Sequence, residues 1–257
     1  MTAVLHVPAF EDNYIWLICG DRDGVAIVDP GEAEPVRAAL DRLGRTPVAI
    51  LCTHHHGDHV GAITELVADY PMPVYGPAHE AIPGLTHPVS GKDEVVLPAL
   101  DLTLRVIDVP GHTAGHIAYY GNGLLFCGDT LFSAGCGRLF EGTAEQMCHS
   151  LQQLAALPAD TLVFCAHEYT ESGLHFALAV EPGNAEARRY LDEVIVLRQH
   201  HRPSLPSTIG RERAVNPFLR GGQSQVRASA EAFAHQPLTS ECEVFGALRR
   251  WKDSFTR

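Results

Sequence analysis

Four short apolar segments of this sequence are each followed, within three residues, by a side chain that can bind a metal ion. Apolar runs of this length, bounded by glycine or proline, are typical of buried strands. Residues that follow strand ends commonly carry function in layered α/β folds. The pattern therefore predicts an α/β fold with its chemistry at one edge. The segments are Pro47–Cys52, Leu102–Val109, Gly123–Cys127 and Leu162–Cys165, followed by His54, His112, Asp129 and His167.

The candidate metal ligands lie closest together in the segment His54-x-His56-x-Asp58-His59. A regular helix or strand would not direct all four side chains at one point, but a tight loop can. Imidazole nitrogen suits borderline transition metals, and a carboxylate adds charge and can bridge two ions. His55 is not expected to be a ligand, because its neighbours on both sides already point inward. A polar, solvated loop is the alternative, and the further candidates after other strands argue against it.

The candidate ligands divide naturally between two metal sites. Two ions about 3.5–4 Å apart lower the pKa of a shared water and hold the attacking oxygen. Asp129 can touch both ions through its two oxygens, and Asp58 and Asp129 would orient the bridging hydroxide. The sequence thus predicts a two-metal hydrolase. The proposed split is His54, His56 and His112 for one ion and Asp58, His59 and His167 for the other, with Asp129 shared.

Composition excludes several other classes of function. The chain has 257 residues, of which 46% are hydrophobic, enough for a sizeable core. A net charge of -12 argues against nucleic acid as a partner. No apolar run is long enough to span a membrane, and Met1–Phe10 does not resemble a secretory signal. The seven cysteines contain no CxxC pair, which predicts free thiols in a reducing, cytoplasmic compartment.

The pattern of predicted secondary structure changes near Pro182. Before it, helical spacing is seen over Glu32–Leu43 and Val60–Ala68. After it come the helical segments Asn184–His201, Ser224–Phe233 and Glu241–Trp251. We therefore expect a metal-binding catalytic domain over residues 1–170 and a small α-helical domain over residues 171–257.

Together these motifs resemble the metallo-β-lactamase superfamily, and within it the glyoxalase II (hydroxyacylglutathione hydrolase) family. The HxHxDH cluster indicates only the superfamily. The helical C-terminal part and the segment Ala134–Arg138 indicate the glyoxalase II family within it. Further matching stretches are Pro8–Tyr14, Pro110–Thr113, Phe126–Phe132, His167–Thr170 and Asn216–Phe218.

The resemblance carries expectations that spacing and composition do not. It implies an αββα sandwich with a small C-terminal α-helical domain. It also implies hydrolysis of the thioester S-lactoylglutathione to glutathione and D-lactate, in methylglyoxal detoxification. The implied cofactors are two divalent ions per chain, zinc in the first instance, with iron and manganese open because both accept mixed nitrogen and oxygen ligands. The chain is expected to act as a monomer.

The resemblance also implies how an acidic protein holds an anionic substrate. Arg138, Arg249 and Lys252 match family positions that grip glutathione, and the last two share one helical face. Tyr169 matches a tyrosine that contacts the same moiety. Phe140 stands where many relatives have tyrosine, so one hydrogen bond to the substrate is in doubt. A solvated basic helix is the alternative interpretation of the C-terminal cations.

Three other functions remain open from the sequence. A persulfide dioxygenase of the same fold would use a single iron, and the C-terminal part with Arg249 and Lys252 argues against it. A β-lactamase is disfavoured because no periplasmic signal is evident. A non-catalytic glutathione-binding module would be expected to have lost some ligands, whereas all seven are present.

Overall fold

The computed structural model describes residues 2–256, which form two compact units. Unit 1 comprises the chain up to Asp108 together with Gly115–Gly128, and unit 2 comprises Val109–Ala114 together with the chain from Asp129 onward. These units do not follow the boundary expected at residue 170, so the predicted division into domains stays a prediction. No helix among the described residues combines the length and apolarity needed to cross a membrane.

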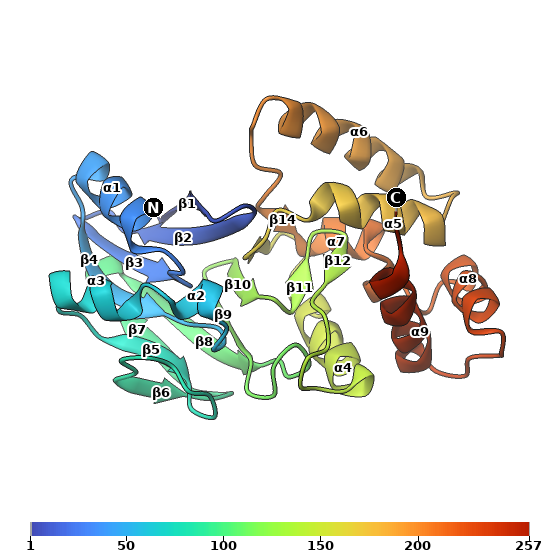
Figure 1. Cartoon of the computed structure of the whole chain (residues 1–257), viewed down its shortest axis with the longest axis horizontal. Coiled ribbons are helices and arrows are strands. Elements are labelled where there is room, and N and C mark those ends of the chain that lie inside the picture. The colour runs from blue at the N-terminus through green and yellow to red at the C-terminus, as the bar shows by residue number, and fades with distance from the viewer. Residues whose placement is uncertain (1, 257) are drawn as a thin grey trace. The chain divides into compact units, whose positions relative to one another are not determined.

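Unit 1 is built on β-sheets with helices on one side (Figure 1). Its first sheet has the strand order β1-β2-β3-β4-β5-β6, and within unit 1 the second has the order β10-β9-β8-β7. The elements are β1 (Ala3–Ala9), β2 (Asn13–Cys19), β3 (Gly24–Val28), α1 (Ala33–Leu43), β4 (Thr46–Leu51), α2 (Gly57–Val60), α3 (Ile63–Asp69), β5 (Val74–Pro77), β6 (His87–Val89), β7 (Glu94–Leu97), the 3-10 turn η1 (Pro98–Leu100), β8 (Leu102–Asp108), β9 (Ile117–Gly121) and β10 (Leu124–Gly128).

The central strands β2 and β3 are buried along their whole length. Alternate residues, such as Ile15 and Leu17, join the core that includes α1 and α3. On strand β9, the Tyr119 hydroxyl donates to the Cys52 carbonyl at 2.9 Å, which links the two sheets. Strands buried on both faces read as continuous apolar runs, and β2 and β3 have this character.

One expected helix is wrong in detail. Val60–Ala68 was predicted as a single helix, but the chain forms the short α2 and then α3, with Gly61 and Ala62 between them. The Ala62 amide donates to the Pro30 carbonyl at 3.0 Å, so the amide leaves the helical ladder. Asp58 and His59 lie within the short helix α2, and not on a loop before a helix.

Unit 2 is mainly helical (Figure 1). Its own core gathers side chains of α5, α6 and α7, including Leu174, Tyr190 and Val194. The elements are β11 (Leu131–Phe132), β12 (Gly135–Cys136), α4 (Ala144–Ala155), β13 (Leu162–Cys165), α5 (Thr170–Val180), α6 (Ala185–Gln199), β14 (Ser207–Thr208), α7 (Ile209–Val215), the 3-10 turn η2 (Pro217–Leu219), α8 (Ser224–Ala234) and α9 (Glu241–Ser254).

The expectation of free thiols throughout is wrong for two cysteines. Cys148 of α4 and Cys242 of α9 form a disulfide, with Cα atoms 5.4 Å apart. The packing of α4 against α9 brings them together across a sequence separation of 94 residues, which no local spacing reveals. Within residues 2–256 the other five cysteines form no disulfide, and all five are buried.

Candidate metal centre and substrate site

Unit 1 contributes four of the predicted metal ligands, all just after β4. His54 and His59 are buried, while His56 and Asp58 are partly exposed. The His54 Nε2 lies 3.1 Å from the His56 Nδ1, and the His59 Nε2 lies 3.4 Å from an Asp58 oxygen. The structure thus brings the potential donor atoms of these side chains close together in pairs.

Two polar side chains orient the buried histidines. The His54 Nδ1 is 3.1 Å from the Thr53 hydroxyl, and the His59 Nδ1 is 3.1 Å from a carboxylate oxygen of Asp29. Asp29 also accepts hydrogen bonds from the Thr53 amide and hydroxyl, both at 2.8 Å. Partners on Nδ1 leave Nε2 to face a metal ion, which is how metal-binding histidines are usually held.

Asp29 contacts a predicted metal ligand and was not predicted from the sequence. It directly follows strand β3, the same pattern that identified the other candidates, but it lies in the turn Asp29-Pro30-Gly31 with no histidine near it in sequence. Its backbone has a φ of 52°, which is uncommon outside glycine and asparagine or aspartate. The fold uses this turn to place a carboxylate beneath the histidine cluster.

Two further contacts organise the same loop. Asn13 donates from its side-chain amide to an Asp58 oxygen at 3.0 Å, so one carboxylate oxygen is held by the protein. The His55 Nδ1 lies 2.9 Å from a Glu80 oxygen, whose other oxygen accepts from the Gly115 amide at 3.0 Å. The contact with Glu80 accords with a structural role for His55. This contact joins residues 25 positions apart and was not predicted from the sequence.

Unit 2 brings together the remaining three predicted ligands, all buried. The His112 Nε2 lies 3.3 Å from one oxygen of Asp129, and the His167 Nε2 lies 3.3 Å from the other. The His112 Nδ1 is 2.9 Å from the Arg138 carbonyl, and this contact again directs Nε2 outward. One carboxylate therefore presents each of its oxygens beside a different imidazole.

A glycine makes this arrangement possible. A Cβ added to Gly137 would overlap the carbonyl oxygen of Asp129 and come within 3.1 Å of the His112 Nδ1. Only glycine allows so close an approach of two chain segments. In both units, imidazole nitrogens and carboxylate oxygens converge, and this set of donors fits divalent transition metals.

The predicted substrate-binding cations gather around Asp253 in unit 2. Arg249 is buried, and its Nη2 donates to Asp253 at 2.9 Å, while the Nε of the largely exposed Arg138 lies 4.0 Å from the same carboxyl oxygen. The Lys252 Nζ donates to the Ser172 hydroxyl at 3.0 Å. Burial, with smaller contributions from the charges of Arg249 and Arg138, lowers the pKa of Lys252. An anionic ligand would relieve this mutual repulsion.

The three cations are not equivalent. Arg249 also donates from Nη1 to the Cys136 carbonyl at 2.9 Å, so two of its nitrogens are committed to the protein. Its Nε is buried without a hydrogen-bond partner among residues 2–256. Arg249 therefore supports the Cys136–Arg138 segment, whereas Lys252 and Arg138 are the accessible charges.

The two predicted aromatic contacts are both exposed in unit 2. Tyr169 stacks on the His167 ring, with centroids 4.8 Å apart. Phe140 meets the His112 ring edge-on at 5.3 Å, and 63% of its surface is exposed. Each therefore covers a predicted metal ligand, and the roles of both in binding a substrate stay predictions.

A buried carboxylate in unit 2 supports the segment that leads to Arg138. Glu212 of α7 accepts hydrogen bonds from the Ala134 amide at 2.7 Å, the Ser133 hydroxyl at 3.1 Å and the Asn216 amide at 3.0 Å, and from the Ser207 hydroxyl. Ala134 has a φ of 55°, a strained conformation that these bonds hold. Sequence spacing offered no indication of this network.

Replacing Glu212 by alanine is expected to lower the free energy of unfolding by about 2–5 kcal/mol, because buried donors lose their acceptor. Glu212→Gln is the matched control. Its amide oxygen can accept from the backbone, and its NH₂ group can donate to the two serine hydroxyls, so most stability should remain. Urea unfolding of the two variants measures the difference, and equal losses would contradict the hydrogen-bond explanation.

The same residue predicts a pH dependence. Burial raises the pKa of Glu212 above its ordinary value of 4.5, although its hydrogen bonds oppose the shift. A carboxyl with a raised folded-state pKa contributes most stability below its ordinary pKa and loses it as pH rises through the raised value. The stability of the wild type relative to Glu212→Gln should therefore fall between acid and neutral pH, measured on metal-free protein.

The role of Asp29 is tested by metal affinity. Asp29→Ala is expected to weaken metal binding about 10- to 100-fold, because the His59 ring loses the partner that orients it. Competition with a chromophoric chelator measures the change. Asp41→Asn, an exposed position on α1 of the same unit, is the control and should bind metal normally. Normal affinity in the Asp29 variant would show that this carboxylate does not position the ligand.

Comparisons with known proteins found relatives over nearly the whole chain. Residues 9–167 match the model of the metallo-beta-lactamase superfamily, and residues 168–255 match the model described as hydroxyacylglutathione hydrolase C-terminus. A protein of Aliivibrio fischeri (strain MJ11) named hydroxyacylglutathione hydrolase is 53% identical, over 99% of this chain and 100% of its own. A protein of the same name from Vibrio cholerae serotype O1 is 52% identical, again over 99% of this chain and 100% of its own.

A solved structure supports the fold independently. The crystal structure of the BLEG-1 B3 metallo-beta-lactamase is similar with a TM-score of 0.64, at 24% identity, over 85% of this chain and 100% of that one. The fold class is therefore the predicted αββα sandwich of this superfamily with a C-terminal helical part. The chain belongs to the hydroxyacylglutathione hydrolase family of the metallo-β-lactamase superfamily.

Proposed function

We propose that this protein hydrolyses S-lactoylglutathione to glutathione and D-lactate, using two divalent metal ions held by the seven predicted ligands. The observation that carries the proposal is Asp129, whose two oxygens each lie 3.3 Å from a different imidazole, on His112 and His167. A carboxylate in this position can bridge two ions. Full-length relatives named hydroxyacylglutathione hydrolase support the choice of substrate.

Each ligand has a physical part in the proposed reaction. When bound, two divalent ions would lower the pKa of a water and polarise the thioester carbonyl. Asp58 and Asp129 would accept hydrogen bonds from the attacking water and orient it toward the carbonyl carbon. The Asn13 amide holds one Asp58 oxygen at 3.0 Å, which restricts this carboxylate to one orientation.

The leaving group explains why no general acid is needed. A thiol has an ordinary pKa near 8.5, so its thiolate can depart without first being protonated. An amine leaving group would need a proton donor. The conspicuous acid–base side chains of this site are either assigned as ligands or, like Asp29, His55 and Glu80, held in contacts within the protein, which suits a thioester better than an amide.

Recognition of the glutathione moiety is proposed for Arg138 and Lys252, with Arg249 supporting the former. The chain has a net charge of -12, so binding an anionic tripeptide requires a local concentration of positive charge. Three cations around the single carboxylate of Asp253 provide it. Tyr169 and Phe140 are proposed to contact the same substrate from beside the metal ligands.

We further propose that the chain acts in the cytoplasm as a monomer and that the ions are zinc. The mixed nitrogen and oxygen donors would also accept iron or manganese. Metal analysis of the purified protein distinguishes these ions, and sedimentation tests the oligomeric state.

Substitution of Lys252 tests recognition separately from chemistry. Lys252→Ala is expected to raise KM for S-lactoylglutathione about 10- to 100-fold with little change in kcat, because the charge holds a part of the substrate remote from the reacting bond. Lys252→Arg keeps the charge and should recover most of the loss. The effect should shrink for a lactoyl thioester that lacks the glutathione carboxylates. Equal effects on both substrates would assign Lys252 to the fold.

The proposal as a whole is tested by steady-state hydrolysis with metal-loaded protein. Release of a free thiol and D-lactate in equal amounts is the expected result. A loaded protein that binds S-lactoylglutathione without hydrolysing it would instead be a glutathione-binding module. Oxygen consumption with glutathione persulfide would indicate a persulfide dioxygenase.

A further inference from the structure

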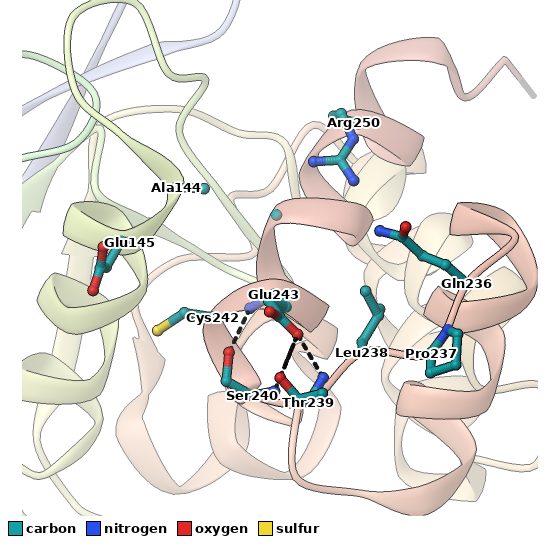
Figure 2. A pocket seen from close by; sticks show the side chains of 11 residues that line it. Ala144, Glu145, Gln236, Pro237, Leu238, Thr239, Ser240, Cys242, Glu243 and Arg250 are labelled. Atoms are coloured by element: carbon teal, nitrogen blue, oxygen red, sulfur yellow. Dashed lines mark hydrogen bonds between the residues drawn. The ribbon is translucent and has the colours of Figure 1, made fainter.

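Unit 2 contains a cavity at the N-terminal end of α9 that none of the proposed chemistry uses. Its volume is about 650 Å³, within the range of roughly 300–1,000 Å³ that small-molecule sites occupy. Its lining comes from the start of α4, from α9 and from the segment that precedes α9 (Figure 2). The cavity is therefore large enough for a molecule of several residues.

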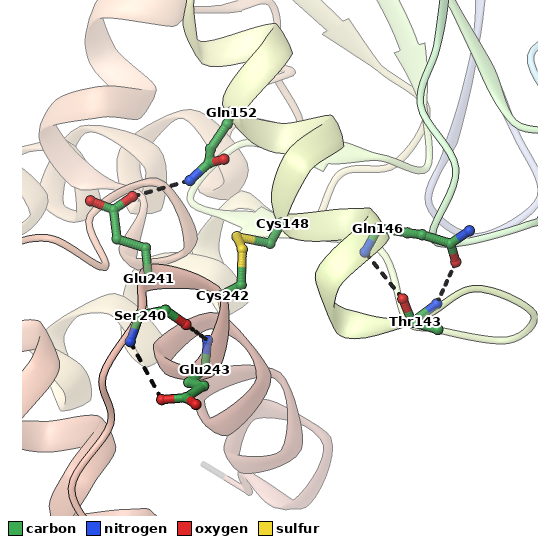
Figure 3. Close-up of a disulfide and its surroundings, with 8 residues drawn as sticks. All are labelled: Thr143, Gln146, Cys148, Gln152, Ser240, Glu241, Cys242 and Glu243. Carbon is green, nitrogen blue, oxygen red and sulfur yellow. Dashed lines mark hydrogen bonds between the residues drawn. A yellow bond between two sulfur atoms is a disulfide. The ribbon is translucent and has the colours of Figure 1, made fainter.

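One of the residues that line this cavity, Cys242, belongs to the disulfide with Cys148. Cys242 lines the cavity and is partly exposed, whereas its partner Cys148 is buried, with 5% of its surface exposed. Figure 3 shows the bond between α4 and α9, with the hydrogen bond from Gln152 to Glu241 beside it. An attacking thiolate must approach a sulfur atom directly, so access favours Cys242 over Cys148.

The charges around the cavity select a kind of thiol. Arg250 and Glu145 both line it, so it offers one cation and one exposed carboxylate. Gly246 also lines the cavity, and a Cβ added there would lie in ordinary contact, 3.4 Å from the Ala144 Cβ and 3.6 Å from the Arg250 Nη1. A small thiol that carries both a carboxylate and an ammonium group complements this pair.

The second acidic side chain of the lining, Glu243, already forms hydrogen bonds within the protein. Its carboxylate accepts from the Thr239 hydroxyl at 2.9 Å and, with Ser240, forms the capping box of α9 (Figure 2). This carboxylate is thus held in the helix cap, which leaves Glu145 and Arg250 as the charges available to a ligand.

We propose that this cavity is a thiol–disulfide exchange site, in which a small zwitterionic peptide thiol forms a mixed disulfide with Cys242. The incoming thiolate attacks the Cys242 sulfur and forms a new sulfur–sulfur bond. The bond to Cys148 breaks, its electron pair leaves on the Cys148 sulfur, and that sulfur takes up a proton. A second thiolate then attacks the small-molecule sulfur of the mixed disulfide and releases the Cys242 thiolate.

The balance of this exchange needs no other reactant. Two thiols are oxidised to one small-molecule disulfide, and the protein disulfide is reduced to two thiols. The reverse sequence, from an oxidised small-molecule disulfide, passes through the same mixed disulfide. The proposal does not rest on the hydrolytic function, because its measurement needs neither a thioester nor a metal ion.

The first test uses the full-length wild-type chain in its disulfide form. The probes are glutathione and 2-mercaptoethanol, adjusted to the same thiolate concentration, and the rate of opening is followed by alkylation and intact mass. Glutathione is expected to react roughly three- to tenfold faster, after correction for intrinsic thiolate reactivity, because its charges pair in the cavity. Equal corrected rates would overturn the proposed ligand class.

Variants then test the site itself. Arg250→Ala should abolish the advantage of glutathione over 2-mercaptoethanol, and Arg250→Lys should retain it. In Cys148→Ser, oxidised glutathione should add once per chain, at Cys242 by peptide mapping. In Cys242→Ser, the buried Cys148 should gain no adduct over the same time. An undiminished advantage in Arg250→Ala, or an equal yield at Cys148, would overturn the site.

Discussion

Asp129→Ala is expected to lower the rate of S-lactoylglutathione hydrolysis by about 10³-fold or more and to remove most of the bound metal. Asp129 is the only side chain assigned to both ions, and its two oxygens face different imidazoles. Loss of metal-assisted catalysis costs several kcal/mol, and each 1.36 kcal/mol is a tenfold change in rate. Elemental analysis and steady-state kinetics on the same sample measure both effects.

A matched aspartate controls for the loss of charge alone. Asp192 is exposed on α6 of the same unit, and Asp192→Ala should keep normal turnover and metal content. If Asp129→Ala retained two ions and normal turnover, Asp129 would not be the bridging ligand.

Removal of the disulfide is also expected to have a large effect on stability. Replacing Cys148 and Cys242 together by alanine should lower the free energy of unfolding by about 2–5 kcal/mol, because the cross-link restricts a long loop of the unfolded chain. Its two ends are 94 residues apart in sequence. Denaturant unfolding, monitored by circular dichroism, gives the change.

The reductant dependence separates the cross-link from the packing of the two sulfurs. Unfolding of the wild type should shift to lower denaturant when a reductant is present, whereas the double variant should not respond. The same midpoint for the wild type with and without reductant would contradict a stabilising role.

The disulfide also links α4 and α9, which support different parts of the predicted site. Helix α4 supports the loop before His112, since the Ser150 hydroxyl donates to the Pro110 carbonyl at 2.7 Å. Helix α9 carries Arg249 and Lys252. The cross-link therefore connects α4, which supports one predicted metal ligand, to the helix that bears two of the predicted substrate-binding cations.

The strands and the predicted metal ligands were accessible from the sequence for a physical reason. A strand buried on both faces must be continuously apolar, so Pro47–Cys52 and Leu162–Cys165 stand out from their surroundings. The polar side chains directly after them interrupt the apolar run and are therefore conspicuous. Both features involve residues that are adjacent in sequence, so they can be recognised from one sequence alone.

The features that were missed depend on contacts between distant segments. Asp29 positions His59 across 30 residues, and Glu212 supports Ala134 across 78. The Cys148–Cys242 bond and the break between α2 and α3 likewise arise from packing. Helix α4 is different, because its capping box Thr143-x-x-Gln146 was visible in the sequence and was not used.

The central claim is that two metal ions per chain support hydrolysis of a glutathione thioester. The most direct test is to add a divalent metal stepwise to metal-free protein while measuring bound metal and S-lactoylglutathione hydrolysis on the same samples. The account predicts that binding saturates at two ions per chain and that full activity requires the second. Full activity at one firmly bound ion, or no hydrolysis at two, would contradict it.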